Sequence, residues 1–340
     1  MISISQRQGK SCRWVSGSQP GRKRCVLAKM IRKRLVSLVI ILFGLSILTF
    51  GLTYLLPSDP VEELITSMGG SHDPEIVEKL EEQYGTSRPF FVQYMDWIKG
   101  VVLHGDFGIS VKYNKPVKEV IAQKLPNTVK LACTSFLTMV LIAFPLGILS
   151  AVYKDRVADY IIRFLSFIGV SMPSFWFGML LIWILAVRLG WLPVAGSSSW
   201  KHIVMPTLTL AMGMSCSYIR RIRAVMVEQL GEEYITGCKS RGIGRIRIIF
   251  THVLPNSLLA VITMLGMSFG GLLGGTMIVE TVFSWNGIGQ VCTTAISARD
   301  YALIQGYTMW MGFIYVIVNL LVDISYSFID PRIRRGMAQK

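Results

Sequence analysis

The sequence has little charge and lacks the motifs of a self-sufficient enzyme. Only 16% of its 340 residues are charged, whereas 52% are hydrophobic; soluble domains carry about 25% charged residues. No GxxxxGKS or GxxxxGKT occurs, so the chain has no P-loop to hold nucleotide phosphates. The metalloprotease motif HExxH is also missing. These absences argue against a soluble enzyme and against a motor that acts alone.

Metal-binding and disulfide patterns are absent as well. The six cysteines are widely spaced without a CxxC pair, and the four histidines show no ligand spacing. We therefore assign no metal site and no catalytic residue to this chain.

Six stretches carry no Asp, Glu, Lys or Arg and are long enough to cross a membrane, which takes about 20 apolar helical residues. They predict an all-α polytopic membrane protein with about six transmembrane helices; a soluble protein with six buried helices is the disfavoured alternative. The stretches are 35–56, 131–152, 164–187, 203–219, 253–279 and 301–322.

The basic residues fall where cytoplasmic segments are expected. Most of the 35 Lys and Arg residues lie before residue 35, around 154–163, between 220 and 247, and after residue 331. Short cytoplasmic loops retain Lys and Arg, so both termini are predicted to be cytoplasmic. The net charge of +15 is thus a topology signal, and no nucleic-acid partner is expected.

Ionisable residues are nearly absent inside the predicted spans, with Glu280 and Asp323 at span ends. Ion-coupled transporters place titratable groups at membrane depth, so a stand-alone channel or secondary transporter is disfavoured. A membrane-bound enzyme is disfavoured because no catalytic cluster is seen. Uphill transport by this chain would need an energy source on another subunit.

The segment 232–255, EEYITGCKSRGIGRIRIIFTHVLP, is the most informative polar stretch. About 30 residues separate Arg220 from the fifth span, whereas a helix–helix turn needs only about 2–8. The residues predict a short helix that ends at Gly242, where a turn with positive φ is expected. Leu254-Pro255 is expected to begin the fifth span, since proline is tolerated in a first helical turn.

This segment resembles the cytoplasmic coupling loop, or EAA loop, of ATP-binding-cassette (ABC) importer permeases. Gly242 and Leu254-Pro255 match its glycine-to-proline spacing, and Glu233-Tyr234 and Arg241-Gly242 match its peptide and nickel branch. Thr236-Gly237-Cys238 stands where the general pattern has Glu-Ala-Ala.

From about Met30 to Arg335 the chain is similar to the dipeptide/oligopeptide/nickel permease family. The stretches GVSMPSFW (169–176) and GGTMI (274–278) look closest to nickel-type members. Further matching motifs are LPSDP (56–60), GDFG (105–108), LPNT (125–128), WLP (191–193), ETVFSW (280–285), GIG (287–289), RDY (299–301) and DPR (330–332).

The resemblance implies a type I ABC importer permease fold in a bacterial inner membrane. It also implies a second homologous permease, two ABC ATPase subunits that hold ATP and Mg, and an extracytoplasmic solute-binding protein; this chain itself would bind no cofactor. The expected organisation is a cytoplasmic tail (1–29), a first span (30–56), an extracytoplasmic region (57–126), a permease core (127–335) with the coupling loop at 223–254, and a short tail (336–340).

Two sets of site residues and a substrate follow from the resemblance. The helix that ends at Gly242 is expected to dock on an ATPase subunit. Nickel, free, chelated or bound to a metallophore, is the first substrate hypothesis, and di- or oligopeptides are the alternative. The coupling set is Glu233, Tyr234, Lys239, Arg241, Gly242, Leu254 and Pro255, and small or soft residues proposed for the translocation pathway are Ser171, Met172, Met264, Met267 and Ser268.

Overall fold

The part of the chain that the structure describes folds almost entirely into helices. The structure, a computed structural model, describes residues 20–55 and 88–329. It begins with α1 (Pro20–Leu55), α4 (Phe90–Lys99), the π-helix η1 (Gly100–His104) and an antiparallel pair, β1 (Ile109–Ser110) and β2 (Lys115–Pro116). The rest comprises α5 (Val117–Val152), α6 (Val157–Ser171), α7 (Ser174–Leu181), η2 (Ile182–Arg188), α8 (Lys201–Leu230), α9 (Glu233–Ser240), α10 (Arg245–Ile248), η3 (Ile249–Val253), α11 (Leu254–Val282), α12 (Ile288–Ser297) and α13 (Tyr301–Ile329).

Among the described residues, four helical stretches could cross a membrane by length and composition: Arg34–Leu55, Val117–Val152, Arg245–Gly266 and Tyr301–Val322. A fifth candidate is the bent pair Val157–Ser171 and Ser174–Arg188. These correspond to five of the six predicted spans. Helix α1 starts ten residues before the expected Met30, and residues 1–19 lie outside the described part.

The expected fourth span corresponds to α8, whose composition alone does not mark it as membrane-spanning. The helix has 30 residues, but Arg220, Arg221 and Arg223 and several Ser, Thr and Gly residues lower its hydropathy. It packs against α5, α6, α7 and α11, and it buries residues along most of its length. A helix enclosed by other helices needs less apolar surface than one that faces lipid.

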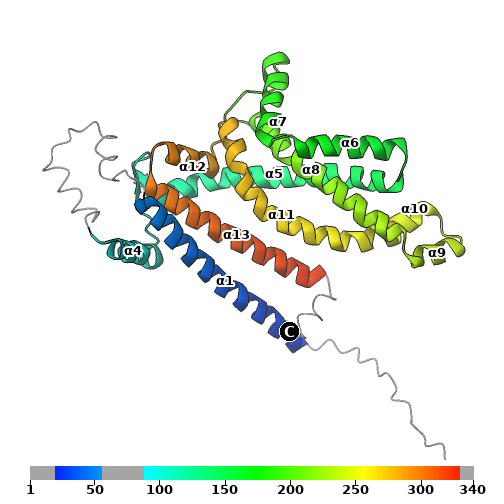
Figure 1. The fold of residues 1–340 in the computed structure, drawn as a ribbon, viewed down its shortest axis with the longest axis horizontal. Coiled ribbons are helices and arrows are strands. Elements are labelled where there is room, and N and C mark those ends of the chain that lie inside the picture. The colour runs from blue at the N-terminus through cyan, green and yellow to red at the C-terminus, as the bar shows by residue number, and fades with distance from the viewer. Residues whose placement is uncertain (1–19, 56–87, 330–340) are drawn as a thin grey trace, which may run out of the picture.

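Pro173 predicts a bend in the third span (164–187), but the structure shows a break between two helices there. Met172 has an extended backbone (φ −83°, ψ 129°), and α6 meets α7 at 103° across this break. Pro173 explains the break, because proline disfavours the helical conformation of the residue before it and donates no backbone hydrogen bond. Figure 1 shows α7 projecting away from α6.

The second span starts earlier than expected. The proline of LPNT (125–128) predicts a start near Leu125-Pro126, but α5 already begins at Val117, and both Pro126 and Pro145 lie inside it. The 36-residue helix would be about 54 Å long at 1.5 Å per residue, more than the hydrocarbon core requires. The α5 helix therefore joins the extracytoplasmic region to the cytoplasmic loop.

The first and last helices pack together beside the other spans. Gln305 in α13 donates a hydrogen bond to Thr53 in α1 (Nε2 to Oγ1, 2.7 Å). Near the end of α1, helix α4 adds the ring of Tyr94, which lies 5.5 Å from that of Phe50 (centroid to centroid). The sequence PEIVEKLEE (74–82) predicts an acidic helix, and this segment lies outside the described residues.

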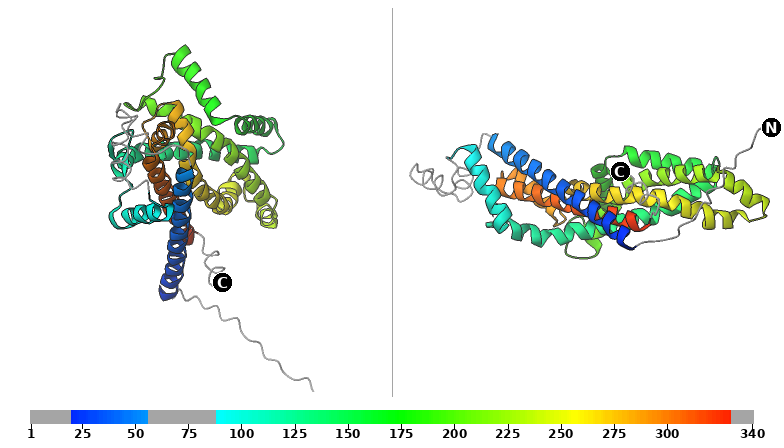
Figure 2. Two further views of the ribbon diagram at one scale, coloured as in Figure 1. Left: turned by 60° about the vertical axis from the view of Figure 1, so that its left-hand side comes forward. Right: turned by 90° about the horizontal axis from the view of Figure 1, so that it is seen from below.

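The two ends of the bundle differ in what they carry. Figures 1 and 2 show α9 and α10 at one end of the long axis and α4 and α12 at the other. Separate apolar clusters support the ends: one lies under α9 and α10, and another joins the start of α5 to α12 and α13. The positive-inside pattern assigns the α9 end to the cytoplasm.

Candidate functional site

The short helix predicted before Gly242 is present as α9, a separate helix after α8. The chain leaves α8 at Leu230, and Glu232 takes an extended conformation (φ −70°, ψ 149°) immediately before α9 begins at Glu233. Glu233 lies in the first turn and Lys239 in the last. Both charges suit the helix dipole, which favours acids at the N-terminus and bases at the C-terminus.

One side of α9 holds the helix against the bundle. Ile235 is 2% exposed and belongs to the apolar cluster under the loop, while Tyr234 and Cys238 pack against that cluster. The Tyr234 hydroxyl also contacts Gln229 in α8, donating to Oε1 at 3.1 Å. Cys238 lies three residues after Ile235 and four after Tyr234, spacings that share one helix side, so α9 is held through a single apolar side.

The remaining side of α9 is open. Glu233, Thr236, Gly237, Lys239, Ser240 and Arg241 are all exposed. A Cβ built on Gly237 meets no atom within 4 Å. Thr236 and Gly237, which depart from the Glu-Ala-Ala pattern, thus form an exposed surface with little side-chain bulk. Such a surface lets another chain approach the backbone closely.

The helix ends at Gly242 as the sequence predicted. Gly242 has φ +74°. Its N–H donates to the Lys239 carbonyl at 2.9 Å, and the Ile243 N–H donates to the Cys238 carbonyl at 3.2 Å. This pair of bonds is the Schellman motif, in which a left-handed residue closes a helix. The space around Gly242 is open, so packing does not exclude a side chain at this position. Glycine is required there because of the positive φ.

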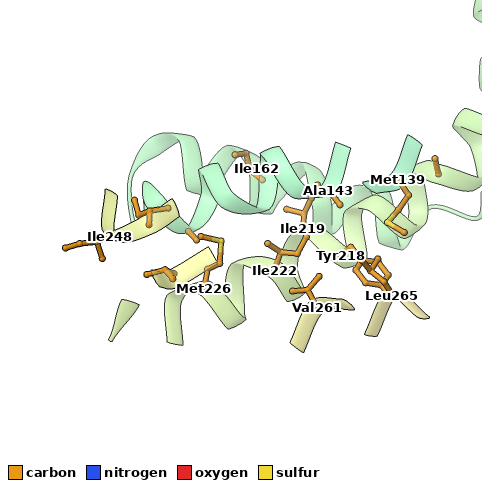
Figure 3. Close-up of a cluster of buried hydrophobic side chains, with 14 of the residues drawn as sticks. Met139, Ala143, Ile162, Tyr218, Ile219, Ile222, Met226, Ile248, Val261 and Leu265 are labelled. Carbon is orange, nitrogen blue, oxygen red and sulfur yellow. The ribbon is translucent and has the colours of Figure 1, made fainter. Parts of the chain in front are cut away.

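The apolar cluster beneath α9 connects the loop to the long helices α5, α8 and α11. Figure 3 shows Met139 and Ala143 of α5, Ile219, Ile222 and Met226 of α8, and Val261 and Leu265 of α11 in this cluster. Ile248 of α10 is part of the same group. The Tyr218 hydroxyl donates to the Met264 carbonyl (2.6 Å), which ties α8 to α11. A displacement of α9 therefore acts directly on packed spans.

The helix expected to start at Leu254-Pro255 begins nine residues earlier. Helix α10 starts at Arg245 and continues through the π-helix η3 directly into α11, where Pro255 occupies the first turn. Pro255 cannot donate a backbone hydrogen bond, and it directly follows the change from π to α hydrogen bonding. Such π segments often mark functional positions in helices. The helical run from Arg245 to Val282 extends from the loop to the far end of the bundle.

A residue that the sequence argument did not single out joins the loop to the second span. The Arg245 guanidinium donates from Nη2 to the carbonyl oxygen of Val152 at 2.6 Å. Val152 is the last residue of α5, whose final carbonyls have no partner within the helix. A cation at a helix C-terminus is favourable, so Arg245 fastens α10 to α5.

A buried ion pair ties α5, α6 and α8 together close to the loop. Asp159 is 0% exposed and receives two hydrogen bonds from Arg223, from Nε at 2.7 Å and from Nη2 at 2.6 Å. Ser150 donates a third bond (2.5 Å), and the backbone N–H of Asp155 donates a fourth (3.0 Å). The carboxylate is thus fully satisfied, as a buried charge must be.

At the opposite end, Glu280 organises the start of α12. Its Oε2 accepts from the N–H groups of Gly289 (2.7 Å) and Gln290 (3.1 Å), and its Oε1 accepts from the Thr128 hydroxyl (2.7 Å). Thr128 in turn accepts from the Ile288 N–H at 2.8 Å. The first N–H groups of a helix lack partners within it, and here a carboxylate from α11 and a hydroxyl from α5 supply them.

The Glu280 network explains why three sequence motifs occur together. A Cβ on Gly289 would lie 2.6 Å from the Met277 Cα, so this position has no room for a side chain. Asn127 donates to the Asn286 carbonyl at 2.7 Å. LPNT (125–128), ETVFSW (280–285) and GIG (287–289) therefore meet in one network. The sequence shows these motifs, but it does not show which of their residues bond to one another.

The RDY motif has a similar role at the start of α13. Asp300 caps this helix by accepting from the Leu303 N–H at 3.1 Å. Its other oxygen accepts from the Ser110 hydroxyl (2.5 Å) and the Lys112 N–H (3.1 Å). Asp300 therefore fixes the β1–β2 hairpin to α13.

The residues predicted for the translocation pathway come from two parts of the fold. Ser171 and Met172 lie at the break between α6 and α7, and the Ser171 hydroxyl bonds back to the Phe167 carbonyl at 3.0 Å. Met264 is partly buried and packs against the cluster under α9. Met267 and Ser268 lie on α11, and their side chains are outside the described residues. The pathway assignment stays a prediction.

Family models cover most of the chain. Residues 143–335 match the family "Binding-protein-dependent transport system inner membrane component", and residues 27–132 match the N-terminal region of such membrane components. The glutathione transport system permease protein GsiC of Escherichia coli (strain K12) is 35% identical over 302 residues, 89% of this chain and 97% of that protein. GsiC of Shigella dysenteriae serotype 1 (strain Sd197) matches to the same extent.

A solved structure described as an amino acid ABC transporter with histidines has a similar fold. It superposes with a TM-score of 0.50 at 17% identity and covers 65% of this chain and 96% of its own. This likeness supports the fold alone.

The helical membrane fold and the match to permease families define a permease subunit, and its relatives are non-catalytic subunits of transporters. The chain belongs to the family of binding-protein-dependent transport system inner membrane components. It is a multi-pass protein of the bacterial inner membrane with the type I ABC importer permease fold. Membership implies that it works with ATPase subunits and a binding protein.

Proposed function

We propose that the chain forms half of the translocation pathway of an ATP-driven importer for short peptides of the di-/oligopeptide or glutathione class. The observation that carries this proposal is the 35% identity to the glutathione permease GsiC over nearly the whole length of both chains. The nickel hypothesis came first from sequence motifs around residues 169–176 and 274–278. The curated relatives described above are named for glutathione, so peptide is the better supported substrate.

In this proposal α9 docks into a groove on an ATPase subunit. Three features support the assignment. The open side carries Glu233, Lys239 and Arg241 for polar contacts, and Gly237 leaves room for close approach. The other side is fastened to the bundle through Ile235 and its neighbours. A docking element has to be exposed on one side and mechanically attached on the other, and α9 meets both conditions.

Movement of α9 would pass to the far end of the bundle along the run from Arg245 to Val282. At about 1.5 Å per residue this helical column is roughly 57 Å long. Arg245 couples its lower end to α5, and Glu280 couples its upper end to α5 and α12. ATP-driven closure of the motor would rock these packed helices between inward- and outward-facing states, a change between two packings. Leu254 and Pro255 lie in this column immediately after its π segment.

The proposed assembly pairs this chain with a second, homologous permease, and a heterodimer is our expectation. Two ATPase subunits bind below, and a solute-binding protein delivers peptide from outside. Ser171, Met172, Met264, Met267 and Ser268 remain the proposed pathway residues. The assignment is tested by labelling a single cysteine introduced at each of these positions. If all five cysteines are shielded from the label in every nucleotide state, the assignment is wrong.

The substrate is tested with the complete transporter in proteoliposomes. ATP hydrolysis is measured after addition of dipeptides, longer peptides, glutathione, nickel ion or nickel–histidine chelate to the binding protein. We expect a peptide or glutathione to stimulate hydrolysis and to accumulate inside the vesicles, with little effect of nickel. Stimulation by the nickel forms alone would reverse the choice of substrate, and uptake without ATPase subunits would contradict the importer mechanism.

A further inference from the structure

A pocket between α6 and α8 combines arginines with aromatic rings near the cytoplasmic end of the bundle. It has a volume of about 480 Å³ and is lined by Tyr160, Arg163, Phe164, Phe167, Arg220 and Arg223. The four residues from α6 are spaced i, i+3, i+4 and i+7, so they lie on one side of that helix. The pocket is separate from the open side of α9.

The pocket carries positive charge that the chain does not neutralise. Arg223 is committed to Asp159, with which it shares two short hydrogen bonds. Within the described ranges, neither Arg163 nor Arg220 makes a salt bridge. The Arg163 guanidinium instead lies 5.7 Å from the centre of the Tyr160 ring, a cation–π arrangement that leaves its donors available. Two exposed guanidinium groups thus face an aromatic wall.

The depth of the pocket matches the headgroup region of the inner leaflet. Arg163 is six residues into α6, or about 9 Å from its cytoplasmic end. Arg220 directly follows the uncharged stretch 203–219 of α8. Arginines at such positions extend their charged ends toward the headgroups while their stems stay in apolar surroundings. Phe164 and Phe167 are exposed beside them, at 65% and 64%.

We propose that this pocket binds an anionic phospholipid of the cytoplasmic leaflet. Arg163 and Arg220 would hold the headgroup phosphate, because the planar guanidinium group pairs well with phosphate oxygens. An acyl chain would lie along Phe164 and Phe167. Basic pockets between transmembrane helices on the cytoplasmic side are suited to anionic headgroups, and each basic residue near such a surface contributes about 1 kcal/mol. The bound lipid would contact the corner where the Asp159–Arg223 pair joins α6 to α8.

The test uses the purified full-length chain and native mass spectrometry, with phosphatidylglycerol and phosphatidylcholine titrated separately. Phosphatidylglycerol should bind at least about tenfold more tightly. Arg163→Gln and Arg220→Gln should each weaken its binding about fivefold, the fold-change that corresponds to one basic contact of this size. Arg247→Gln is the matched control, since it removes the same charge from the exposed α10 on the same side. It should change binding less than twofold.

Other occupants give distinct results. If millimolar inorganic phosphate displaces phosphatidylglycerol and binds with equal affinity, the pocket is a free-anion site and the lipid proposal is wrong. If Arg163→Gln leaves lipid binding at the control level but disrupts assembly with the second permease, the surface is a protein interface. Salt provides a check without mutation: binding of phosphatidylglycerol to the unaltered chain should weaken as salt rises, and salt-independent binding would overturn the proposal.

Discussion

The two ends of the bundle differ in how their charged residues are used. At the extracytoplasmic end, the Glu280 carboxylate is fully buried and accepts hydrogen bonds from the backbone of α12 and from Thr128. At the cytoplasmic end, α9 is attached by one apolar side, and its remaining residues are open. The first arrangement fixes three helices relative to one another, whereas the second leaves polar groups for a partner.

This difference indicates which residues are candidates for contacts with a partner protein. A buried charged residue with every oxygen satisfied, such as Glu280 or Asp159, is explained by the fold of its own chain. The exposed residues of α9 have no comparable task within the chain. The comparison therefore predicts large losses of stability from changes at the buried networks, and small losses but impaired coupling from changes on the open side of α9.

The largest effect is expected for Glu280→Ala. The substitution leaves the N–H groups of Gly289 and Gln290 buried without acceptors, at about 1–3 kcal/mol for each unsatisfied group. We expect a total loss of about 3–5 kcal/mol and a thermal midpoint lower by on the order of 10 °C, measured on the purified chain in detergent. Glu228→Ala, at an exposed position on α8, is the control and should shift the midpoint by about 2 °C or less. Equal shifts for the two variants would refute the structural role of Glu280.

A somewhat smaller loss is expected for Arg223→Met, which leaves the Asp159 carboxylate buried without its cation. Breaking a buried pair by removing one partner costs about 3 kcal/mol or more, even when other hydrogen bonds remain. Adding Asp159→Asn should recover part of this loss, because the unpaired charge is then gone. The exposed pair Arg88–Asp96, 3.2 Å apart, offers a contrast: Arg88→Met should cost less than about 1 kcal/mol. A thermal-unfolding cycle compares the unaltered chain, Arg223→Met, Asp159→Asn and the double variant. A result without coupling between Asp159 and Arg223 would argue against the network.

Within the loop, two glycines should respond in opposite ways to the same change. Gly242→Ala forces a Cβ into a left-handed conformation and should destabilise the end of α9 by about 1–2 kcal/mol. Gly237→Ala should stabilise the helix by up to about 1 kcal/mol, since alanine is the better helix former and the space around it is open. Amide hydrogen exchange of α9 measures both effects.

A larger side chain at Gly237 separates the effect on folding from the effect on docking. A bulky Gly237→Trp should leave the permease folded but prevent ATPase association, because it fills the surface that the partner approaches. Normal ATPase association of Gly237→Trp would show that this side of α9 is not the docking surface.

The smallest effect is expected for Arg245→Gln. It removes the charged donor to the Val152 carbonyl at the exposed end of α5, a bond worth about 1 kcal/mol or less where water can replace it. Arg247→Gln, two residues away, should be neutral. The informative readout is coupling: transported peptide per ATP hydrolysed should fall for Arg245→Gln alone. If both variants transport equally well, the link from α10 to α5 has no role in transmission.

The sequence predicted the helical membrane class, the separate short helix before Gly242 and the positive φ of Gly242, because each follows from local composition or backbone sterics. It misplaced the starts of α5 and of the helix leading into α11, since prolines were taken to begin helices that in fact start earlier. It also treated the region around Pro173 as one bent span. The partners of Glu280, Asp159 and Asp300 could not be predicted, because they come from helices distant in sequence. The likeness to nickel-type members rested on short motifs and did not distinguish substrates.

Hydrogen–deuterium exchange of the segment 233–242 tests the central claim most directly. The exchange is compared between the permease alone and the permease assembled with its ATPase subunits, with the exposed turn at Lys154–Arg156 and the hairpin at 109–116 as reference regions. Docking of α9 predicts at least about tenfold slower exchange of its amides in the assembly and no change at the extracytoplasmic hairpin. Unchanged exchange of α9, with protection confined to other cytoplasmic segments, would contradict the assignment of α9 as the coupling helix.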